Sequence, residues 1–236
     1  MMVHGTLYLI PSMIGESPVA KIIPGFNLKV IRDLKYFIVE EIKTARRFLK
    51  QVSPDINLQT ILFLVNNEHT QVQDLSSIIE PLLNGSDMGL LSEAGMPCVA
   101  DPGAEIVKLA HHYNIKVIPL IGASSLLLSL MASGFNGQNF IFHGYLPIDK
   151  NSRNKKIKEI EKSVYTNNQT QIFNEAPYRN SRLFESITEI CSDNTLLCVA
   201  TDLTMESEII KVHSIRNWKG KQPDIHKKPT VFLLYK

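Results

Sequence analysis

The residues best suited to chemistry in this 236-residue chain are carboxylates that sit in turns beside apolar runs. Residues 92–105 read SEAGMPCVADPGAE and hold three acids, two glycines, two prolines and no base. Phosphate-binding loops need free backbone N–H groups and usually a nearby cation. This stretch therefore disfavours a polyphosphate. It suits a cationic or zwitterionic ligand, or one rich in hydroxyl and amino groups.

Part of the same stretch has a purely local interpretation. Asp101, Pro102 and Gly103 are typical of a loop that ends where a helix begins, with Asp101 as the helix N-cap and proline in the first turn. We expect this local role to hold. It explains neither Glu93 nor Gly95, which stay candidates for ligand binding.

Two more glycine-containing turns follow expected strands, PSMIGES at 11–17 and IGASS at 121–125. Neither is a dinucleotide-binding or phosphate-loop motif. In the second turn, Gly122 and Ala123 would let a ligand approach the backbone closely. Ser124 or Ser125 would equally well cap the helix that follows, and the residues alone leave both interpretations open.

Four acids are candidates for a general base or for orienting a substrate: Glu175, Asp202, Glu40 and Glu93. Glu175 lies just after an expected strand and Asp202 ends another, where site residues usually project. Each acid has the ordinary alternative of a helix cap or a surface ion pair. Arg179, close to Glu175 in the segment FNEAPYR, would contact a phosphate or form a salt bridge with Glu175.

Basic residues suggest a second kind of contact. Arg46 and Arg47 are neighbours on an expected helix and point in different directions, so at most one faces a site; we take Arg46 as the substrate-binding candidate. The stretches 150–162 and 216–228 are rich in lysine, and Trp218 in the second is a candidate to stack on a base of single-stranded RNA. For the first stretch we favour the alternative of a solvated helix face.

Composition excludes several classes of protein. Apolar residues make up 44% and charged residues 20%, as in ordinary globular proteins. A formal net charge of +2 argues against a polyanion-binding surface over the whole molecule but allows a local patch. The three cysteines have no zinc or disulfide spacing and read as small core residues of a reducing compartment.

The remaining expectations concern metals and membranes. His69, His111, His112 and His143 lack metal-ligand spacing as a set, so we predict no metal. The N-terminus has no basic region typical of a signal peptide. Prolines, glycines and serines interrupt the long uncharged run at 117–143, which favours a strand, a turn and a buried helix over a membrane span. We expect a cytoplasmic protein.

Alternating apolar runs and helical patterns predict an α/β fold with largely parallel sheets. The expected strands are 6–10, 36–39, 60–65, 88–91, 116–120, 139–143, 171–173, 196–200, 208–213 and 231–235. The expected helices are 42–52, 72–83, 106–113, 124–132, 154–165 and 180–191. Ten strands are many for one sheet, so we expect two lobes, 1–117 and 118–236. Turns rather than helices link the last strands, which predicts an antiparallel end to the second sheet.

Taken together, the segments of this chain resemble the tetrapyrrole methylase family of S-adenosylmethionine-dependent methyltransferases, closest to its bacterial branch that methylates ribose 2′-hydroxyls of small-subunit rRNA. Nine segments carry the resemblance in the family's order and cover almost the whole chain. They are GTLYLIPSMIGE (5–16), VEEIKTARRFL (39–49), NNEH (66–69), LLSEAGMPCVADPGAEIV (90–107), VIPLIGASSLLLSLMASGF (117–135), FHGYLP (142–147), FNEAPYR (173–179), TDLT (201–204) and KPTVFLLY (228–235).

The resemblance implies two α/β/α lobes with S-adenosylmethionine in the cleft between them, usually in a homodimer. By position it implies these cofactor-binding residues: Pro11, Ser92, Glu93, Ala94, Gly95, Met96, Ile121, Gly122, Ala123, Ser124, Tyr145, Leu146, Pro229 and Thr230. Arg46, Tyr178 and Arg179 would bind the substrate, and Glu175, Asp202 and Glu40 would be catalytic. The partner would be ribosomal RNA or the small ribosomal subunit, with no membrane and no metal.

The departures from the family pattern keep other functions open. Ser12-Met13 replaces the usual Thr-Pro, Met96 replaces Thr, and Tyr178 replaces His. Residues 39–43 read VEEIK where the family has Ala-Glu-Asp-Thr-Arg, and residues 120–123 read LIGA where Pro-Gly-Pro is usual. The typical rRNA enzyme also continues into a small C-terminal domain, whereas this chain ends at Lys236. The alternatives are a methyltransferase of the same fold acting on a tetrapyrrole-like small molecule or a protein, or a cofactor-binding protein without turnover.

Overall fold

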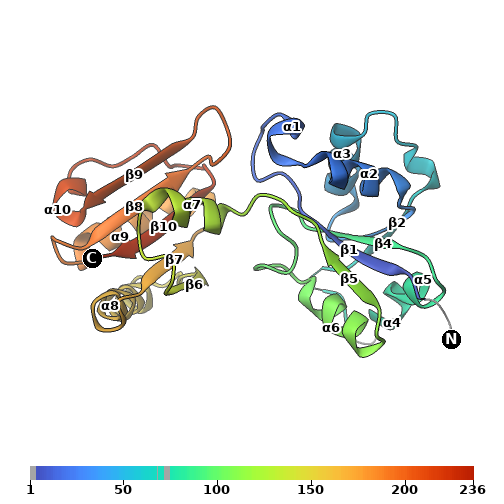
Figure 1. Ribbon diagram of the computed structural model, residues 1–236. Helices are drawn as coiled ribbons and strands as arrows, with labels where there is room; N and C mark the ends of the chain where they lie inside the picture. Colours follow the sequence, from blue (N-terminus) through green and yellow to red (C-terminus); the bar gives the residue numbers. More distant parts are fainter. Residues whose placement is uncertain (1–3, 68, 72–74) are drawn as a thin grey trace. The chain divides into compact units, whose positions relative to one another are not determined.

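The computed structural model describes residues 4–67, 69–71 and 75–236 (Figure 1). The chain divides into two compact units, one ending at Ser124 and the other running from Ser125 to Lys236. A boundary after residue 117 would cut β5 (Lys116–Pro119), which belongs to the first sheet. Each unit is built on one five-stranded sheet with helices, so the expected α/β fold of two lobes is confirmed.

The first sheet is entirely parallel, in the order β3-β2-β4-β1-β5. Its other strands are β1 (Thr6–Ile10), β2 (Tyr36–Val39), β3 (Leu62–Val65) and β4 (Met88–Leu91). Because all five strands run the same way, the turns that follow them lie along one edge of the sheet. Figure 1 shows β4, β1 and the edge strand β5 of this sheet side by side.

Helices cover both faces of this sheet. On one face, α2 (Gly25–Asp33) and α3 (Ile42–Val52) pack over Ile10, Phe37 and Leu91. On the other, α4 (Leu75–Ile78), α5 (Glu80–Leu83) and α6 (Ala104–His112) pack over Leu7 and Ile38. Apolar residues of α3 recur at helical spacing and are buried, which is why this helix lies flat on the sheet. A short helix α1 (Val19–Ile22) and a 3-10 turn (Leu58–Thr60) complete the unit.

Some helices of the first unit differ from the sequence prediction. In place of one helix at 72–83 there are α4 and α5, and residues 72–74 lie outside the described part. Pro81 in the first turn of α5 explains the break, because its ring removes a backbone N–H and clashes with a preceding turn. Helix α2 was not predicted: one of its two buried residues is the polar Asn27, so its apolar pattern is weak.

The second sheet is mixed, in the order β6-β7-β10-β8-β9. Its strands are β6 (Phe140–Tyr145), β7 (Thr170–Asn174), β8 (Leu196–Thr201), β9 (Ile209–Ser214) and β10 (Thr230–Tyr235). Only β6 and β7 pair in parallel, whereas β10 pairs antiparallel with β7 and β8, and β8 with β9. The turn between β8 and β9 makes that antiparallel pairing possible.

Helices also cover both faces of the second sheet. Alternate residues of β10 point to opposite faces, with Phe232 in one apolar cluster and Leu233 in another. The first cluster contains residues of α8 (Lys150–Asn167), α9 (Asn180–Ile190) and α10 (Ile215–Trp218), and the second those of α7 (Ser125–Ser133). Helix α10 lies between β9 and β10, where only a turn was expected. Within the described residues, no helix combines the length and apolar character that crossing a membrane requires.

Candidate active site

In the first unit, two of the predicted ligand-binding turns are joined directly. They follow β1 and β4, which are neighbours in the sheet. The backbone N–H of Ser12 donates to the carbonyl of Gly95 at 2.9 Å, and the Ser92 hydroxyl donates to the same carbonyl at 2.7 Å. Gly95 has a φ of +75°, and a Cβ atom there would lie 3.1 Å from Cγ2 of Ile14. Glycine is therefore what lets the two turns close on each other.

The third turn, after β5, joins the first at Pro11. A Cβ atom on Gly122 would lie only 2.2 Å from Cβ of Pro11, a distance that real structures do not tolerate. On the other side, the buried amide of Asn27 donates to the carbonyl of Ile121 at 2.7 Å. Asn27 is a site-supporting residue that sequence reasoning missed, because a lone asparagine in an unpredicted helix gave no signal.

The structure thus brings the ten cofactor candidates of this unit to one edge of the first sheet. They are Pro11, Ser92, Glu93, Ala94, Gly95, Met96, Ile121, Gly122, Ala123 and Ser124. Ser92 is buried, Glu93 and Ala94 are exposed, and Ile121 is 76% exposed. The edge therefore combines a fixed backbone with side chains that remain accessible.

A small pocket of about 100 Å³ opens beside the first two turns. Helix α3 supplies one wall, and Arg47 and Glu93 both line it. Its lining residues are Ser12, Met13, Thr44, Ala45, Arg47, Phe48, Gln51, Leu91, Ser92 and Glu93. Arg46, the residue we predicted, instead lies over the ring of Phe63 at 5.5 Å. Arg47 shares a helix face with Thr44 and Gln51 at spacings of three and four, so helical periodicity could have distinguished the two arginines.

Three carboxylates influence one another at the ends of β2 and β4. The pKa of Glu40 is raised to about 7, chiefly by burial and then by the negative charges of Asp101 and Glu93. A hydrogen bond between the Glu40 and Asp101 side chains raises it further, and one with the Glu93 backbone lowers it. A carboxyl group with this pKa exchanges a proton near neutral pH, as a general base or acid must.

Asp101 organises the loop before α6, but not as the helix N-cap. Its Oδ1 accepts the backbone N–H groups of Gly103 at 2.7 Å and Cys98 at 3.2 Å, while the helix begins at Ala104 with Gly103 as its N-cap. Cys98 and Ala100 have φ angles of 66° and 60°, which non-glycine residues rarely adopt. The Asp101 carboxylate thus holds a strained loop beside Glu40.

All three cysteines are free thiols. Cys191 and Cys198 are buried core residues, as expected, and Cys98 is half-buried in the loop beside Asp101. Burial and then the charge of Asp101 raise the pKa of Cys98 to about 11, so its thiol stays protonated at neutral pH. Among the described residues, no group of three or more histidine, cysteine, aspartate or glutamate side chains is arranged to hold a metal ion.

In the second unit, the other candidates gather at one edge of the second sheet. Tyr145 at the end of β6 pairs with Asn174 at the end of β7, and Thr230 at the start of β10 pairs with Thr201 at the end of β8. Because β10 runs opposite to β7 and β8, its beginning lies beside their ends. Tyr145, Leu146, Glu175, Tyr178, Arg179, Asp202, Pro229 and Thr230 are all on or beside this edge.

Glu175 and Arg179 form the salt bridge that was one of two alternatives for Arg179. Oε1 of Glu175 accepts from Nε of Arg179 at 2.9 Å, from Nη2 at 2.5 Å and from the N–H of Ala176 at 2.7 Å. The two side chains are 2% and 16% exposed. The guanidinium also lies 5.3 Å from the centre of the Tyr178 ring. The negative charge of Glu175 is therefore already compensated within the protein.

The other candidates of this edge differ in accessibility. Asp202 is buried, accepts from the Ser207 hydroxyl at 2.9 Å and lies 4.0 Å from the Lys228 ammonium. The Thr230 hydroxyl donates to the carbonyl of Lys228 at 3.0 Å. The side chain of Leu146 is buried in the core, whereas Tyr145 is 64% exposed. At Leu146 only the backbone is thus left for a ligand to contact.

The predicted role of Trp218 as a stacking platform is wrong. The side chain is 3% exposed, donates from Nε1 to the carbonyl of Leu197 at 2.9 Å and packs edge-on against Phe184. An aromatic residue in a basic stretch looked accessible, but α10 turns its indole into the core. Nearby, Lys219 pairs with Asp193 at 2.6 Å, so part of the local positive charge is neutralised.

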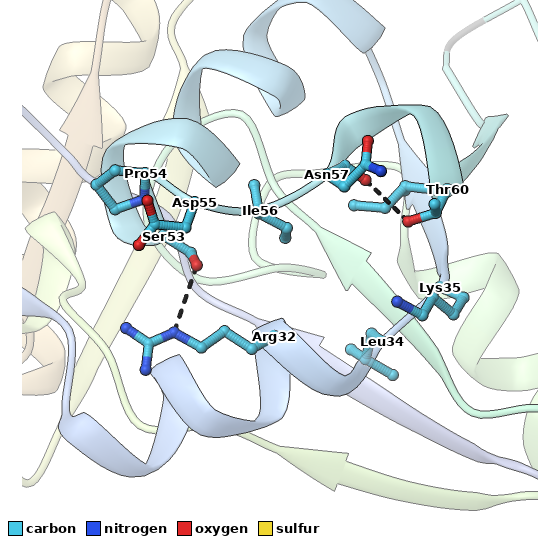
Figure 2. A pocket seen from close by; sticks show the side chains of 10 residues that line it. Arg32, Leu34, Lys35, Ser53, Pro54, Asp55, Ile56, Asn57 and Thr60 are labelled. Carbon is cyan, nitrogen blue, oxygen red and sulfur yellow. Dashed lines mark hydrogen bonds between the residues drawn. The ribbon is translucent and has the colours of Figure 1, made fainter.

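A second pocket of the first unit, about 400 Å³, lies at the opposite edge of its sheet (Figure 2). Lys35 precedes β2 and Ile61 precedes β3, so this pocket is at the amino ends of the strands. Figure 2 shows Nε of Arg32 bonded to the Ser53 hydroxyl, at 3.3 Å. In parallel α/β sheets ligands bind at the carboxyl ends of strands. The smaller pocket therefore agrees better with the expected site.

Comparison with known proteins gives relatives along most of the chain, although no family model matches it. Ribosomal RNA small subunit methyltransferase I of Buchnera aphidicola subsp. Schizaphis graminum is 28% identical over 240 aligned residues, which cover 98% of this chain and 78% of that protein. The protein of the same name from Bacillus subtilis (strain 168) is 32% identical over 204 residues, 86% of this chain and 65% of that protein.

A solved structure is similar in fold. The methyltransferase CobJ aligns with a TM-score of 0.63, covering 98% of this chain and 94% of that one, at 14% sequence identity. The match spans both units of the chain, and the curated relatives are likewise named as methyltransferases. The chain is therefore similar, along nearly its whole length, to methyltransferases of the tetrapyrrole methylase family, and it shares the fold of CobJ.

Proposed function

We propose that this methyltransferase transfers a methyl group from S-adenosylmethionine to a ribose 2′-hydroxyl of small-subunit ribosomal RNA. The observation that carries the proposal is that three turns meet at one edge of the first sheet, where the carboxylates of Glu40, Glu93 and Asp101 also cluster. The names of the curated relatives supply the substrate class. A cytoplasmic location would follow from an RNA substrate and agrees with three free thiols.

The residues at this edge suit the cofactor. When bound, S-adenosylmethionine supplies an electrophilic methyl group on a positively charged sulfur. Glu40, Glu93 and Asp101 provide negative charge beside the turns. A bound cation would reduce the repulsion among these carboxylates, which contributes to the raised pKa of Glu40. Arg47 and Glu93, which line the same small pocket, offer one partner for each charge of an amino acid end. The backbone of the closely packed turns would hold the uncharged parts of the cofactor.

Glu40 is our choice for the general base. With S-adenosylmethionine bound, the 2′-hydroxyl oxygen would take the methyl group, the carbon–sulfur bond electrons would remain on sulfur, and a neutral thioether would leave. The hydroxyl proton passes to the Glu40 carboxylate, whose pKa of about 7 suits it to accept a proton at neutral pH. A positioned base contributes roughly 10²–10⁴-fold to rate. Asp202, buried at the end of β8, remains the second candidate.

Glu175 has a different proposed role. Three hydrogen bonds to its Oε1, two of them from a guanidinium, occupy this oxygen with partners inside the protein. We assign it the fixing of Arg179 at the substrate side, next to Tyr178. Tyr145, the Leu146 backbone, Pro229 and Thr230 at the same edge are proposed as further cofactor-binding residues.

A homodimer is part of the proposal. The edge strand β6 exposes Phe140 and Ile141 by 42% and 40%, and Met131 on α7 is 77% exposed. Exposed apolar side chains of this kind often mark protein interfaces. Sedimentation equilibrium of the purified chain is expected to give a dimer. A monomer at micromolar concentration would contradict this part without affecting the reaction.

The deciding experiment is methyl transfer from labelled S-adenosylmethionine to small ribosomal subunits that lack the modification. Label should appear in rRNA. After alkaline hydrolysis it should be found at one nucleotide whose phosphodiester remains uncleaved, because 2′-O-methylation blocks cleavage of the adjacent phosphodiester. Label found only in a low-mass fraction or in protein would instead support the alternative substrates. No calorimetric binding at millimolar S-adenosylmethionine would contradict the cofactor assignment.

A further inference from the structure

Tyr178 stands out among the aromatic residues of the second unit because it is both exposed and held. It lies on a 3-10 turn, Pro177–Arg179, that follows β7, and 63% of its surface is exposed. The neighbouring guanidinium of Arg179 lies over its ring, 5.3 Å from the centre. One face of the ring is therefore supported from within the protein, and most of the residue remains open to a ligand.

The support under the ring is rigid. Arg179 cannot move freely, since its Nε and Nη2 both donate to the 2%-exposed carboxylate of Glu175. The N–H of Arg179 also donates to the carbonyl of Ala176 at 2.7 Å, which closes the turn. A chain of contacts thus runs from a buried acid through a guanidinium to an exposed ring. Such pre-organisation lowers the entropy lost when a ligand stacks on the ring.

A cation lies beside the same turn. The backbone N–H of Lys227 donates to the carbonyl of Pro177 at 3.0 Å, which fixes Lys227 next to Tyr178 in space although it is distant in sequence. Lys227 is exposed, and in the part of the chain that the structure describes no acidic side chain lies within ion-pair distance of its ammonium. An open aromatic face with an unpaired lysine beside it is the pairing by which proteins hold single-stranded nucleic acid.

We propose that Tyr178 is the stacking platform for a nucleobase of the RNA substrate, with Lys227 beside it for the adjoining phosphate. The inference rests on the proposed function and names the substrate contact of that site. Tyr178 follows β7, whose last residue pairs with Tyr145 and Val231, so a base stacked there would lie at the edge assigned to the cofactor.

The test uses full-length variants and measures KM separately for undermodified small ribosomal subunits and for S-adenosylmethionine. Tyr178→Leu keeps an apolar side chain of similar reach but has no π face, and its KM for the subunits should rise about tenfold with little change in KM for the cofactor. Tyr178→Phe should stay within about twofold of the unchanged protein. Tyr165→Leu is the matched control, because Tyr165 is a 45% exposed tyrosine on α8 outside this edge.

A salt titration gives an independent readout. Lys227→Gln should reduce the slope of log Kd against log salt for the subunits by about one unit, and Tyr178→Leu should leave that slope unchanged. An unchanged KM for the subunits in Tyr178→Leu, when the unchanged protein methylates them, would overturn the stacking proposal and leave the proposed function intact. A rise only in the cofactor KM would overturn it in favour of adenine. If the unchanged protein methylates no RNA, the proposed function itself fails.

Discussion

Glu40 and Glu175 occupy equivalent places in two different sheets, yet their surroundings are opposite. Each follows a strand that ends at the candidate edge of its unit, β2 for Glu40 and β7 for Glu175. Glu40 faces two other acids, and its pKa is raised to about 7. Glu175 faces Arg179, which donates two hydrogen bonds to it. The position in the fold is shared, and the neighbours decide the chemistry.

This difference teaches that the end of a strand identifies a place for function but not the role of the residue there. An acid among acids holds its proton to a higher pH and can take part in proton transfer. An acid bound to a guanidinium instead fixes the position of its partner. We therefore expect substitutions at the first edge to change reaction rate, and substitutions at the second to change stability and substrate binding.

The largest expected effect is on turnover. Glu40→Gln should lower kcat by roughly 10²–10⁴-fold, because the amide cannot accept the proton of the attacking hydroxyl. Stability at neutral pH should not fall, since the change removes repulsion among carboxylates. Single-turnover methyl transfer to undermodified subunits measures the effect. Glu41→Gln is the matched control: Glu41 is exposed and caps α3, and glutamine keeps an oxygen that can accept from Lys43. Equal rates for the two variants would exclude Glu40 as the base.

Breaking the ion pair of the second edge should act on stability. Glu175→Ala leaves a guanidinium that is only 16% exposed without its partner, which should cost about 3 kcal/mol in the free energy of unfolding. Urea denaturation followed by circular dichroism measures this. In the double variant Glu175→Ala/Arg179→Met the charge is gone as well, so much of the stability should return. A single-variant cost below about 0.5 kcal/mol would mean that the pair behaves as a solvent-screened surface pair.

The backbone contact between the turns gives a smaller effect. Gly122→Ala would place a methyl group 2.2 Å from Cβ of Pro11, so the turns must move apart at a cost of about 1–3 kcal/mol. We expect a weaker affinity for S-adenosylmethionine in calorimetry together with this loss of stability. Gly25→Ala is the control, since nothing lies within 4 Å of its added Cβ. Normal cofactor affinity in Gly122→Ala would separate this turn from the cofactor site.

The smallest expected effect is a shift in pH dependence. Asp101→Asn keeps an oxygen for the N–H groups of Gly103 and Cys98 but removes a charge that raises the pKa of Glu40. The midpoint of the rise in kcat/KM with pH, expected near 7 in the unchanged protein, should move to lower pH by about one unit. An unmoved midpoint would show that another group controls the profile.

Stability should depend on pH with the corresponding sign. Because the folded-state pKa of Glu40 is raised from 4.5 to about 7, the folded protein holds this proton more tightly than the unfolded chain does. The contribution of Glu40 to stability is therefore largest below the unfolded value and declines as pH rises from about 4.5 to 7. The decline should be smaller in Asp101→Asn. Denaturant midpoints across this pH range give the comparison.

The α/β alternation, the two lobes and the core face of α3 could be predicted from the sequence because they depend on local periodicity. The split of the expected helix at 72–83 depends on Pro81, whose local effect overrides the apolar pattern of the segment. Helix α2 and Asn27 could not be predicted, since the value of a buried amide lies in the carbonyl of Ile121, which only the fold brings near.

The residues of the candidate site also divide into those that local sequence signals predict and those that depend on the fold. The three turns could be identified because glycine, proline and acids in short stretches after apolar runs are local signals. Whether Arg46 or Arg47 faces the pocket, and whether Trp218 is exposed, depended on which side of each helix meets the sheet. Periodicity offers a guide in the first case. In the second, a four-residue helix is too short for any pattern to indicate its buried face.

The sequence by itself determined that this chain is an α/β protein with three ligand-suited turns and a set of candidate acids. The folded structure chose between the two alternatives for Arg179 and gathered Asp101 and Glu93 around Glu40. A carboxylate has the same intrinsic chemistry at every position, and the raised pKa of Glu40 depends on burial and on Asp101 and Glu93, which distant segments bring beside it. These neighbours are close to Glu40 only in the folded chain, so the sequence could not predict which acid has the raised pKa.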